Sequence, residues 1–362
     1  MQSYPLHSLI DGSWFKLICG ASYQHLPVVR NLALAYSVAG ADCIDVAADP
    51  AVIAAAKAGI AAAQQLDRDS KSRVLPWLMI SINDGEDPHF RKARFEVAQC
   101  PSECPQPCVQ VCPAEAIDLS SGGVIDNRCY GCGRCLPICP QELINTDSHL
   151  SSVGEVRQWI EPLSVDAIEI HTQVGHYDNF KKVWHDLLPI IDQLKLIAIS
   201  CTDAPEVIEY LRSLHALISP LPCPLVWQTD GRSMSGDIGK GTTHAAISFA
   251  QKVLQAQLPG YVQLAGGTNG YTVNKLRQLN LLRQPNLPLP HTVSGVAYGS
   301  YARTVLLPIL NKLQAPELQA IQFNSFKTPS MPQFNLKLEQ DQESLTQAVA
   351  TASRLVDQLK KA

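Results

Sequence analysis

The sequence has few charged residues, no excess of basic ones and no long apolar run. Charged side chains make up 17% of the 362 residues, below the ~25% that is typical of globular proteins. Hydrophobic residues make up 46%, which excludes a disordered chain and provides for a large core. The net charge of −4 does not indicate the excess of basic residues that nucleic-acid binding needs, so we expect no nucleic-acid partner.

Signals for membranes and export are also missing. A membrane span needs about 20 apolar residues, and the longest candidate, Leu32–Val46, is interrupted by Asp42 and Asp45. The first 12 residues lack the charged and apolar parts of a secretory signal. We therefore expect no membrane span and a cytoplasmic protein. Thiols stay reduced there, so clustered cysteines indicate metal ligands rather than disulfides.

Most of the chain alternates short apolar runs with helical stretches. Eight candidate strands are mostly non-alternating, as parallel strands buried on both faces are. They lie at Phe15–Ser22, Cys43–Asp49, Trp77–Asp84, Ala167–Gln173, Leu194–Thr202, Pro224–Gly231, Val262–Asn269 and Gly295–Tyr301. Eight strand–helix units favour an α/β fold of the (β/α)8 TIM-like barrel type over an open doubly wound sheet.

The helical stretches and one interruption set the expected domains. Helices are predicted at Leu26–Gly40, Pro50–Leu66, Asn179–Leu194, Ala204–Ile218, Thr242–Ala256, Tyr271–Leu282 and Ala302–Leu313. No clean helix follows Asp84, where a cysteine-rich segment begins instead. We predict a discontinuous barrel over residues 1–93 and 151–315, with residues 94–150 inserted after strand three. Residues 316–362 form a C-terminal extension that ends in a helix over Gln340–Lys360.

One run of cysteines carries a specific motif. The sequence from Cys129 to Pro140 reads C-x2-C-x2-C-x3-C-P, the bacterial ferredoxin signature, with ligands at Cys129, Cys132, Cys135 and Cys139. Thiolates two residues apart can wrap one cubane if the backbone curls tightly. Gly131 and Gly133 supply that freedom.

An earlier run repeats the motif with wider spacing. Cys100, Cys104, Cys108 and Cys112 follow C-x3-C-x3-C-x3-C-P. The duplication resembles the two-cluster bacterial ferredoxins, a ferredoxin-like α+β domain. That resemblance implies two [4Fe–4S] clusters. One would be held by Cys129, Cys132, Cys135 and Cys112, and the other by Cys100, Cys104, Cys108 and Cys139.

Three alternatives remain open for these cysteines. The wider spacing allows one of them to be a spectator, with a labile or [3Fe–4S] cluster at that site. Two zinc sites would also use eight cysteines, but structural zinc sites usually pair cysteines as two separated hooks. A purely structural role for the metal is the third, since about 50 residues make a thin core. The remaining cysteines, Cys19, Cys43, Cys201 and Cys223, are expected to be small buried side chains.

Polar residues near the predicted strand ends form a second group of candidates. They are Lys16, Asp45, Asp49, Asn83, Asp84, His171, Asp203, Asp230 and Arg232. Lys16 or His171 is suited to acid–base chemistry, although each residue is also explained as a satisfied structural polar group.

Two glycine-rich stretches give further candidates for binding a cofactor. Gly266, Gly267 and Asn269 follow strand seven, and Lys240 precedes a helix. Barrels frequently bind phosphate after strands seven and eight. The alternative is that the glycines only make tight turns. We assign no catalytic residue.

The order of three blocks resembles one family over nearly the whole chain. The blocks are Trp14–Tyr23, the ferredoxin-like segment and Gln263–Gly270. Together they are similar to the cyanobacterial light-dependent period family, whose members are iron–sulfur proteins of circadian clock input. The resemblance implies a redox sensor that adjusts clock period to light, with clock-input proteins or electron-transfer proteins as partners. The alternative is a ferredoxin-coupled barrel oxidoreductase that binds a flavin or phosphorylated ligand at the barrel mouth.

Overall fold

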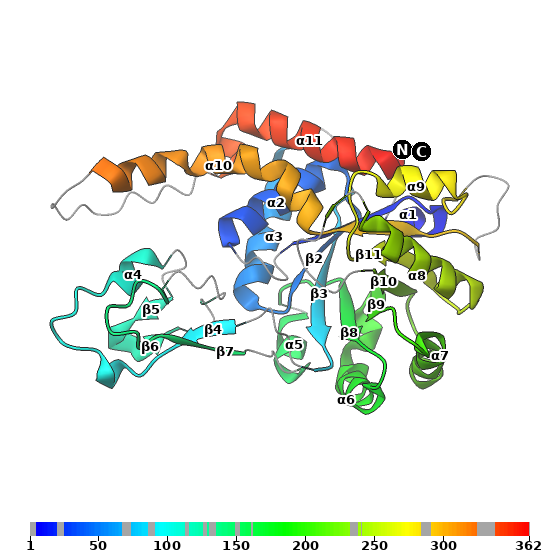
Figure 1. Cartoon of the computed structure of the whole chain (residues 1–362), viewed down its shortest axis with the longest axis horizontal. Helices are drawn as coiled ribbons and strands as arrows, with labels where there is room; N and C mark the ends of the chain where they lie inside the picture. Colours follow the sequence, from blue (N-terminus) through cyan, green and yellow to red (C-terminus); the bar gives the residue numbers. More distant parts are fainter. Residues whose placement is uncertain are drawn as a thin grey trace.

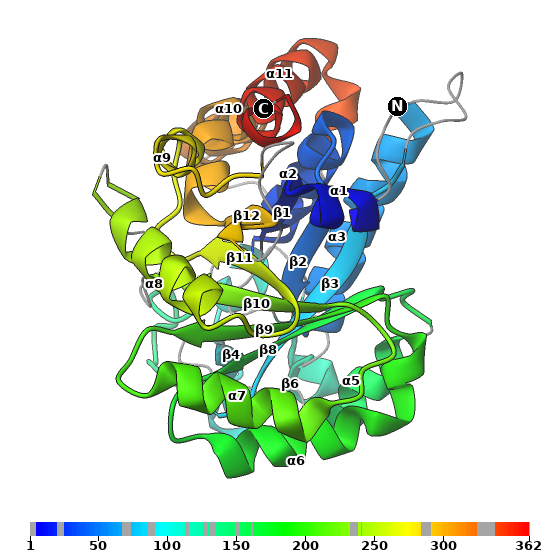
Figure 2. The ribbon, with the colours of Figure 1, turned by 90° about the vertical axis from the view of Figure 1, so that its right-hand side faces the viewer.

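Eight parallel strands form a closed barrel, in the order β1-β12-β11-β10-β9-β8-β3-β2. The computed structural model describes residues 5–19, 25–66, 74–85, 91–112, 116–125, 129, 135–148, 153–160, 162–231, 238–239, 241–283, 291–323 and 337–361. The barrel strands are β1 (Trp14–Ile18), β2 (Cys43–Ala47), β3 (Trp77–Asn83), β8 (Ala167–Thr172), β9 (Leu196–Thr202), β10 (Leu225–Asp230), β11 (Tyr261–Ala265) and β12 (Gly295–Tyr298). This confirms the predicted (β/α)8 TIM-like barrel (Figures 1 and 2).

Helices pack around the outside of the barrel and follow its strands in sequence. They are α2 (Leu26–Ala39), α3 (Pro50–Leu66), α5 (Val153–Ile160), α6 (Tyr177–Leu187), α7 (Val207–Ile218), α8 (Thr243–Gln255), α9 (Thr272–Gln278) and α10 (Ser300–Phe323). Gly40 ends α2 in the left-handed conformation, with φ of 95°, as the sequence predicts. Helix α7 starts later than predicted because Glu206 has φ of 63°. Helix α6 stops earlier and continues as the 3-10 helix η3 (Leu188–Gln193), which carries a proline in its first turn.

Two helices at the chain ends complete the barrel. Helix α1 (Pro5–Asp11) lies before β1, and its buried Leu9 packs with Trp14 and other apolar side chains. Helix α11 (Gln342–Lys360) follows the short 3-10 helix η5 (Leu338–Gln340) and packs against α2 and α10. Lys360 Nζ donates to Ser8 Oγ at 2.7 Å and to Asp42 Oδ2 at 2.6 Å. The first and last described helices are therefore joined through one ammonium group.

The cysteine-rich segment leaves the barrel after β3 and returns before α5. It contains β4 (Arg91–Arg94), η1 (Val97–Gln99), α4 (Pro107–Val111), β5 (Ile117–Asp118), η2 (Leu119–Ser121), β6 (Gly123–Val124) and β7 (Asn145–Ser148). Strands β4 and β7 pair antiparallel, as do β5 and β6. The segment lies beside the barrel in Figure 1 and behind its strands in Figure 2. The predicted domain boundaries and the ferredoxin-like fold of this segment stay predictions.

No helix within the described ranges is long and apolar enough to cross a lipid bilayer.

Candidate functional site

Lys16 stands at the centre of a charged network inside the barrel. Its side chain is 0% exposed, and its ammonium lies 2.8 Å from Asp45 Oδ2 and also pairs with Glu169. Burial alone would lower the pKa of Lys16, but Asp45 and Glu169 raise it above its usual value. Lys16 therefore remains an ammonium ion and is unsuited to act as a base or as a nucleophilic amine.

Glu169 connects Lys16 to the C-terminal end of the barrel. Its Oε1 lies 2.9 Å from His171 Nε2 and accepts from Gln228 Nε2 at 2.7 Å. Burial alone would raise the pKa of Glu169, but Lys16 and His171 lower it to about 2. The network continues towards the other end, because Gln263 donates to Gln228 and accepts from Trp14 Nε1, both at 2.6 Å.

Sequence reasoning missed Glu169, Gln228, Gln263, Ser81 and Ser200, which face the same interior. A signal for the first two was present: Glu169 and His171, like Gln228 and Asp230, are two residues apart in otherwise apolar strands. Residues two apart on a strand point to the same face. In a barrel strand that periodicity marks the inward side chains.

Asp49 lies after β2 and has two roles. Its Oδ1 accepts from the backbone N–H groups of Ala51 at 2.9 Å and Val52 at 3.1 Å, at the start of α3. Its Oδ2 lies 3.1 Å from Lys92 Nζ, and both side chains are almost fully buried. Because Lys92 belongs to β4, this buried ion pair joins the cysteine-rich segment to the barrel.

The glycine loop after β11 is held by internal bonds. Gly266 and Gly267 have φ of 62° and 88°, so the loop requires glycine and β11 ends before them. Asn269 Nδ2 donates to Gly239 O at 2.7 Å, and its Oδ1 accepts from Tyr271 N at 2.9 Å. These contacts give Asn269 a structural role in clamping the two loops. The predicted anion residue Lys240 lies outside the described residues.

The other predicted strand-end residues are in separate places. Asp84 lies 2.9 Å from His176 Nδ1 and accepts from Thr172 Oγ1. Asp203 pairs with Lys252 at 2.9 Å on the exposed surface. Asn83 has contacts of its own, and Arg232 lies outside the described residues. Of the described members of that group, the structure brings together Lys16, Asp45, His171 and Asp230.

The described cysteines of the segment gather around one small apolar cluster. Cys108, Cys129 and Cys135 are buried in it, and Cys112 and Cys139 pack against it. Desolvation is the largest effect that raises the pKa of Cys100. The neighbouring Cys104, Cys108 and Cys139 thiols raise it further. These four cysteines therefore lie within electrostatic range of one another. Cys132 is not among the described residues.

Backbone N–H groups point at several of the cysteine sulfurs. Ala93 N donates to Cys129 Sγ at 3.4 Å, and Ala116 N donates to Cys112 Sγ at 3.2 Å. Burial would raise the pKa of Cys139, but backbone N–H groups of residues 141–144 lower it. Such donors stabilise thiolates and tune iron–sulfur clusters. The cysteines thus fit this cofactor.

No three His, Cys, Asp or Glu side chains in the described ranges converge closely enough to hold one metal ion. A cubane makes no such demand, because each of its four cysteines binds a different iron.

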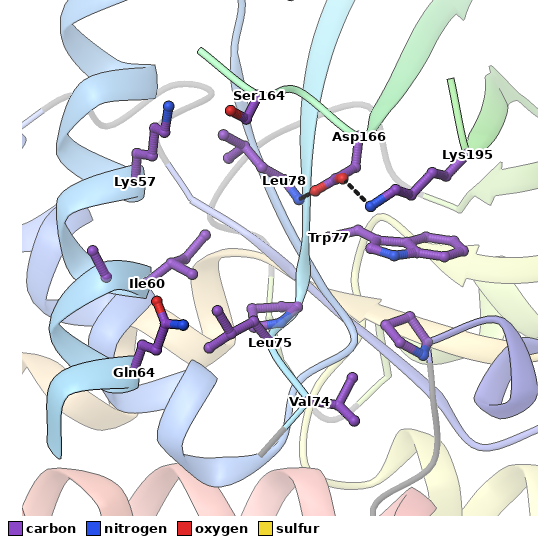
Figure 3. Close-up of a pocket in the computed structure, with 13 residues that line it drawn as sticks. Lys57, Ile60, Gln64, Val74, Leu75, Trp77, Leu78, Ser164, Asp166 and Lys195 are labelled. Atoms are coloured by element: carbon purple, nitrogen blue, oxygen red, sulfur yellow. Dashed lines mark hydrogen bonds and ion pairs between the residues drawn. The ribbon is translucent and has the colours of Figure 1, made fainter. Parts of the chain in front are cut away.

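A cavity of about 580 Å³ lies at the opposite, N-terminal end of the strands (Figure 3). It is lined by α3 residues, including Lys57 and Ile60, and by the start of β3 at Trp77. Asp166 Oδ1 pairs with Lys195 at 2.6 Å, and its Oδ2 accepts from Leu78 N at 2.9 Å. None of the residues predicted as functional lines this cavity.

These features define an α/β-barrel protein with a cysteine-rich segment built for an iron–sulfur cofactor. Residues 100–150 match the family model described as the LdpA Fe-S cluster-binding domain. Residues 159–358 match the light dependent period A C-terminal domain. The chain is also 50% identical over 360 residues to "Light dependent period A" of Synechococcus elongatus, covering 99% of this chain and 95% of the relative. The chain belongs to the light dependent period A family.

Two solved structures are weakly similar to the chain. N-acetylneuraminate lyase from Mycoplasma synoviae is 9% identical with a TM-score of 0.34, covering 82% of this chain and 71% of that one. A GH20 module of the pneumococcal exo-beta-D-N-acetylglucosaminidase StrH is 10% identical with a TM-score of 0.30, covering 99% and 100% of the two chains.

Proposed function

We propose that this protein is an iron–sulfur redox sensor that adjusts the period of the circadian clock to light and cellular redox state. Membership of the light dependent period A family and the matched cluster-binding domain support this proposal. The observation that carries the sensing mechanism is the buried Lys92–Asp49 ion pair. Through this ion pair a metal-binding segment contacts the barrel directly.

The segment is proposed to bind two [4Fe–4S] clusters. One set of ligands is Cys112, Cys129, Cys132 and Cys135, and the other is Cys100, Cys104, Cys108 and Cys139. The mutual electrostatic influence of Cys100, Cys104, Cys108 and Cys139 supports the second set. The buried positions of Cys129 and Cys135 and the N–H donor to Cys112 support the first set.

A short path connects the first cluster to the barrel. Ala93 N donates to Cys129 Sγ, and the preceding residue, Lys92, pairs with Asp49. Asp49 in turn caps the first turn of α3. A change of one charge at the cluster acts on this hydrogen bond, which is stronger to a more negative sulfur. The response therefore passes through β4 to the ion pair and to the start of α3.

The direct partners are proposed to be circadian clock-input proteins that recognise the barrel in one of two redox states. Electron-transfer proteins that exchange electrons with the clusters are the second proposed class of partner. An intracellular, cytoplasmic location suits both classes, because free thiolates and reduced clusters persist there.

The test compares oxidised and reduced protein by hydrogen–deuterium exchange after iron and sulfide have been measured. We expect about eight iron atoms per chain and coupled EPR signals on reduction. We also expect redox-dependent exchange in the first turns of α3 (Pro50–Leu66). Lys92→Gln should abolish that difference while keeping the iron. The matched control is Lys252→Gln, which breaks an exposed pair with Asp203.

Two results would contradict the proposal. One is equal exchange of α3 in both redox states of the wild type. The other is normal light-dependent tuning of period in cells by Cys→Ser variants that have lost their clusters. Four or fewer iron atoms per chain would limit the proposal to a single cluster.

A further inference from the structure

The interior of the barrel is divided into an apolar half and a charged half. Near the N-terminal ends of the strands, Trp14, Trp77 and Leu196 pack together beneath Leu9 of α1. Towards the C-terminal ends, the inward side chains are Lys16, Asp45, Ser81, Glu169, His171, Ser200, Gln228 and Asp230. Barrel enzymes place their active sites at this C-terminal end.

Burying such a charged network is energetically unfavourable compared with filling the barrel with apolar side chains. Replacing buried ionic groups with well-packed apolar residues is often neutral or stabilising, and the other half of this barrel is filled in that way. Charged groups with shifted pKa values that are kept in a barrel interior therefore indicate a functional site.

His171 and Asp230 are the two charged groups of the network nearest to solvent. His171 is 37% exposed, and its Nε2 is held by Glu169. Asp230 is partly buried, accepts from Ser200 Oγ, and has Gln228 Nε2 at 3.4 Å. The two groups influence each other electrostatically, yet no ion pair joins them among the described contacts. Ser200 lies between them, because it is the strand partner of His171 and its Oγ donates to Asp230. An acid and a carboxylate are thus neighbours at this end of the barrel without forming a pair.

Their surroundings set the two groups to opposite protonation states at neutral pH. Burial would lower the pKa of His171, but Glu169 raises it to about 9. Burial raises the pKa of Asp230 to about 6, against the opposing charge of His171. Between these values His171 is an acid and Asp230 a base. Titratable neighbours whose pKa values are separated in this way identify an acid–base pair.

The charge balance of the network selects among ligands. Within the described network, three carboxyl groups, from Asp45, Glu169 and Asp230, are set against two cations, Lys16 and His171. These described groups therefore offer no excess of positive charge to a phosphate or carboxylate. One donor and one acceptor suit an uncharged molecule with a carbonyl oxygen and an adjacent acidic C–H group.

We propose that the C-terminal end of the barrel is a proton-transfer site for small uncharged α-hydroxycarbonyl compounds, with His171 and Asp230 as its catalytic residues. Asp230 takes the proton from the carbon beside the carbonyl, and that C–H bond breaks. His171 gives its Nδ1 proton to the carbonyl oxygen, and an O–H bond forms. The product is the enediol, and the reverse step returns a solvent-derived proton to carbon. No electron is transferred.

The test uses the whole protein with dihydroxyacetone in D2O, and proton NMR follows the loss of the α-hydrogen signal. We expect exchange faster than in buffer alone. General acid–base groups contribute roughly 10²–10⁴-fold, so Asp230→Asn and His171→Gln should each lower the protein-dependent rate at least about 100-fold. Asp203→Asn, at the exposed end of β9, is the control and should leave the rate unchanged.

The wild type provides a readout that does not depend on how the variants fold. Its rate should rise with pH through about 6, as Asp230 loses its proton, and fall through about 9, as His171 does. Exchange no faster than in buffer, or a rate without these two limbs, would overturn the proposal. The step needs no cluster electrons, so its failure and the failure of the redox-sensing proposal are distinguishable.

Discussion

The barrel and the cysteine-rich segment are stabilised in different ways. The barrel encloses a continuous apolar layer between strands and helices, which includes Phe15, Trp227 and Phe249. Among the described residues of the segment, seven form its buried core and three of those are cysteines: Ala93, Cys108, Ala116, Ile117, Cys129, Cys135 and Ile144. The barrel can depend on apolar burial alone, whereas the segment depends on whatever its thiolates bind.

The largest expected effect is loss of the segment's structure when its iron–sulfur cofactor is lost. Cys135→Ser removes one buried sulfur from the core of the segment. We expect amides of residues 91–148 to lose most of their protection against hydrogen exchange, while the barrel strands keep theirs. Exchange measured by mass spectrometry separates the two regions. Cys223→Ser, a matched change outside the segment, should leave both regions protected.

If the segment stayed protected in Cys135→Ser protein that contains no iron, its stability would not depend on the metal. Its short strands and small apolar cluster would then be sufficient without metal.

A smaller effect is expected from breaking the charged network of the barrel. Glu169→Ala leaves buried Lys16 with Asp45 as its remaining carboxylate. Removing one partner of a buried pair costs about 3–5 kcal/mol, so the free energy of unfolding should fall by that amount. All five tryptophans lie outside residues 94–150, so denaturation followed by tryptophan fluorescence measures the barrel alone.

The exposed pair of Asp203 and Lys252 gives the control for this measurement. Asp203→Ala should change the unfolding free energy by no more than about 1 kcal/mol, because water screens surface pairs. Equal losses in the two variants would show that the interior network contributes no more than a surface ion pair.

The smallest expected effect is a pH dependence from His171. Its pKa is raised to about 9 in the folded protein, against about 6.5 when unfolded. It therefore stabilises the fold fully below about 6.5, and this contribution disappears as the pH rises through about 9. The difference in unfolding free energy between wild type and His171→Gln should be larger at pH 6 than at pH 9.5. A difference that grows with pH would contradict the Glu169–His171 ion pair.

The sequence was sufficient to predict the barrel because its signals are local. Each strand is a short apolar run, and helix ends are marked by residues such as Pro27 and Gly40. Where the predictions erred by a few residues, one backbone angle decided the outcome, as at Glu206 or Gly266. Positive φ at a non-glycine residue such as Glu206 is uncommon and cannot be recognised from the residue type.

The charged sites were harder to predict because their members are distant in the chain. Lys16 and His171 were recognised as candidates one by one, but Glu169, which joins them, was not. Lys92 pairs with Asp49 across two regions of the molecule. The arrangement of strands around the closed barrel determines which of these residues meet. No spacing motif in the sequence predicts such pairs. The cysteine motif was recognisable because its cysteines are close in sequence.

The bond between Lys360 and Asp42 has a consequence for how the protein is made. Strand β1 pairs with β12, and α11 packs against α2 and α10 beside them. The barrel therefore reaches its full packing only after α11 has left the ribosome. The cysteine-rich segment emerges roughly 210 residues earlier. At 5–20 residues per second this is an interval of about 10–40 s. During that time the cysteines are accessible to the cell's cluster-assembly machinery on a nascent chain, before the barrel is complete.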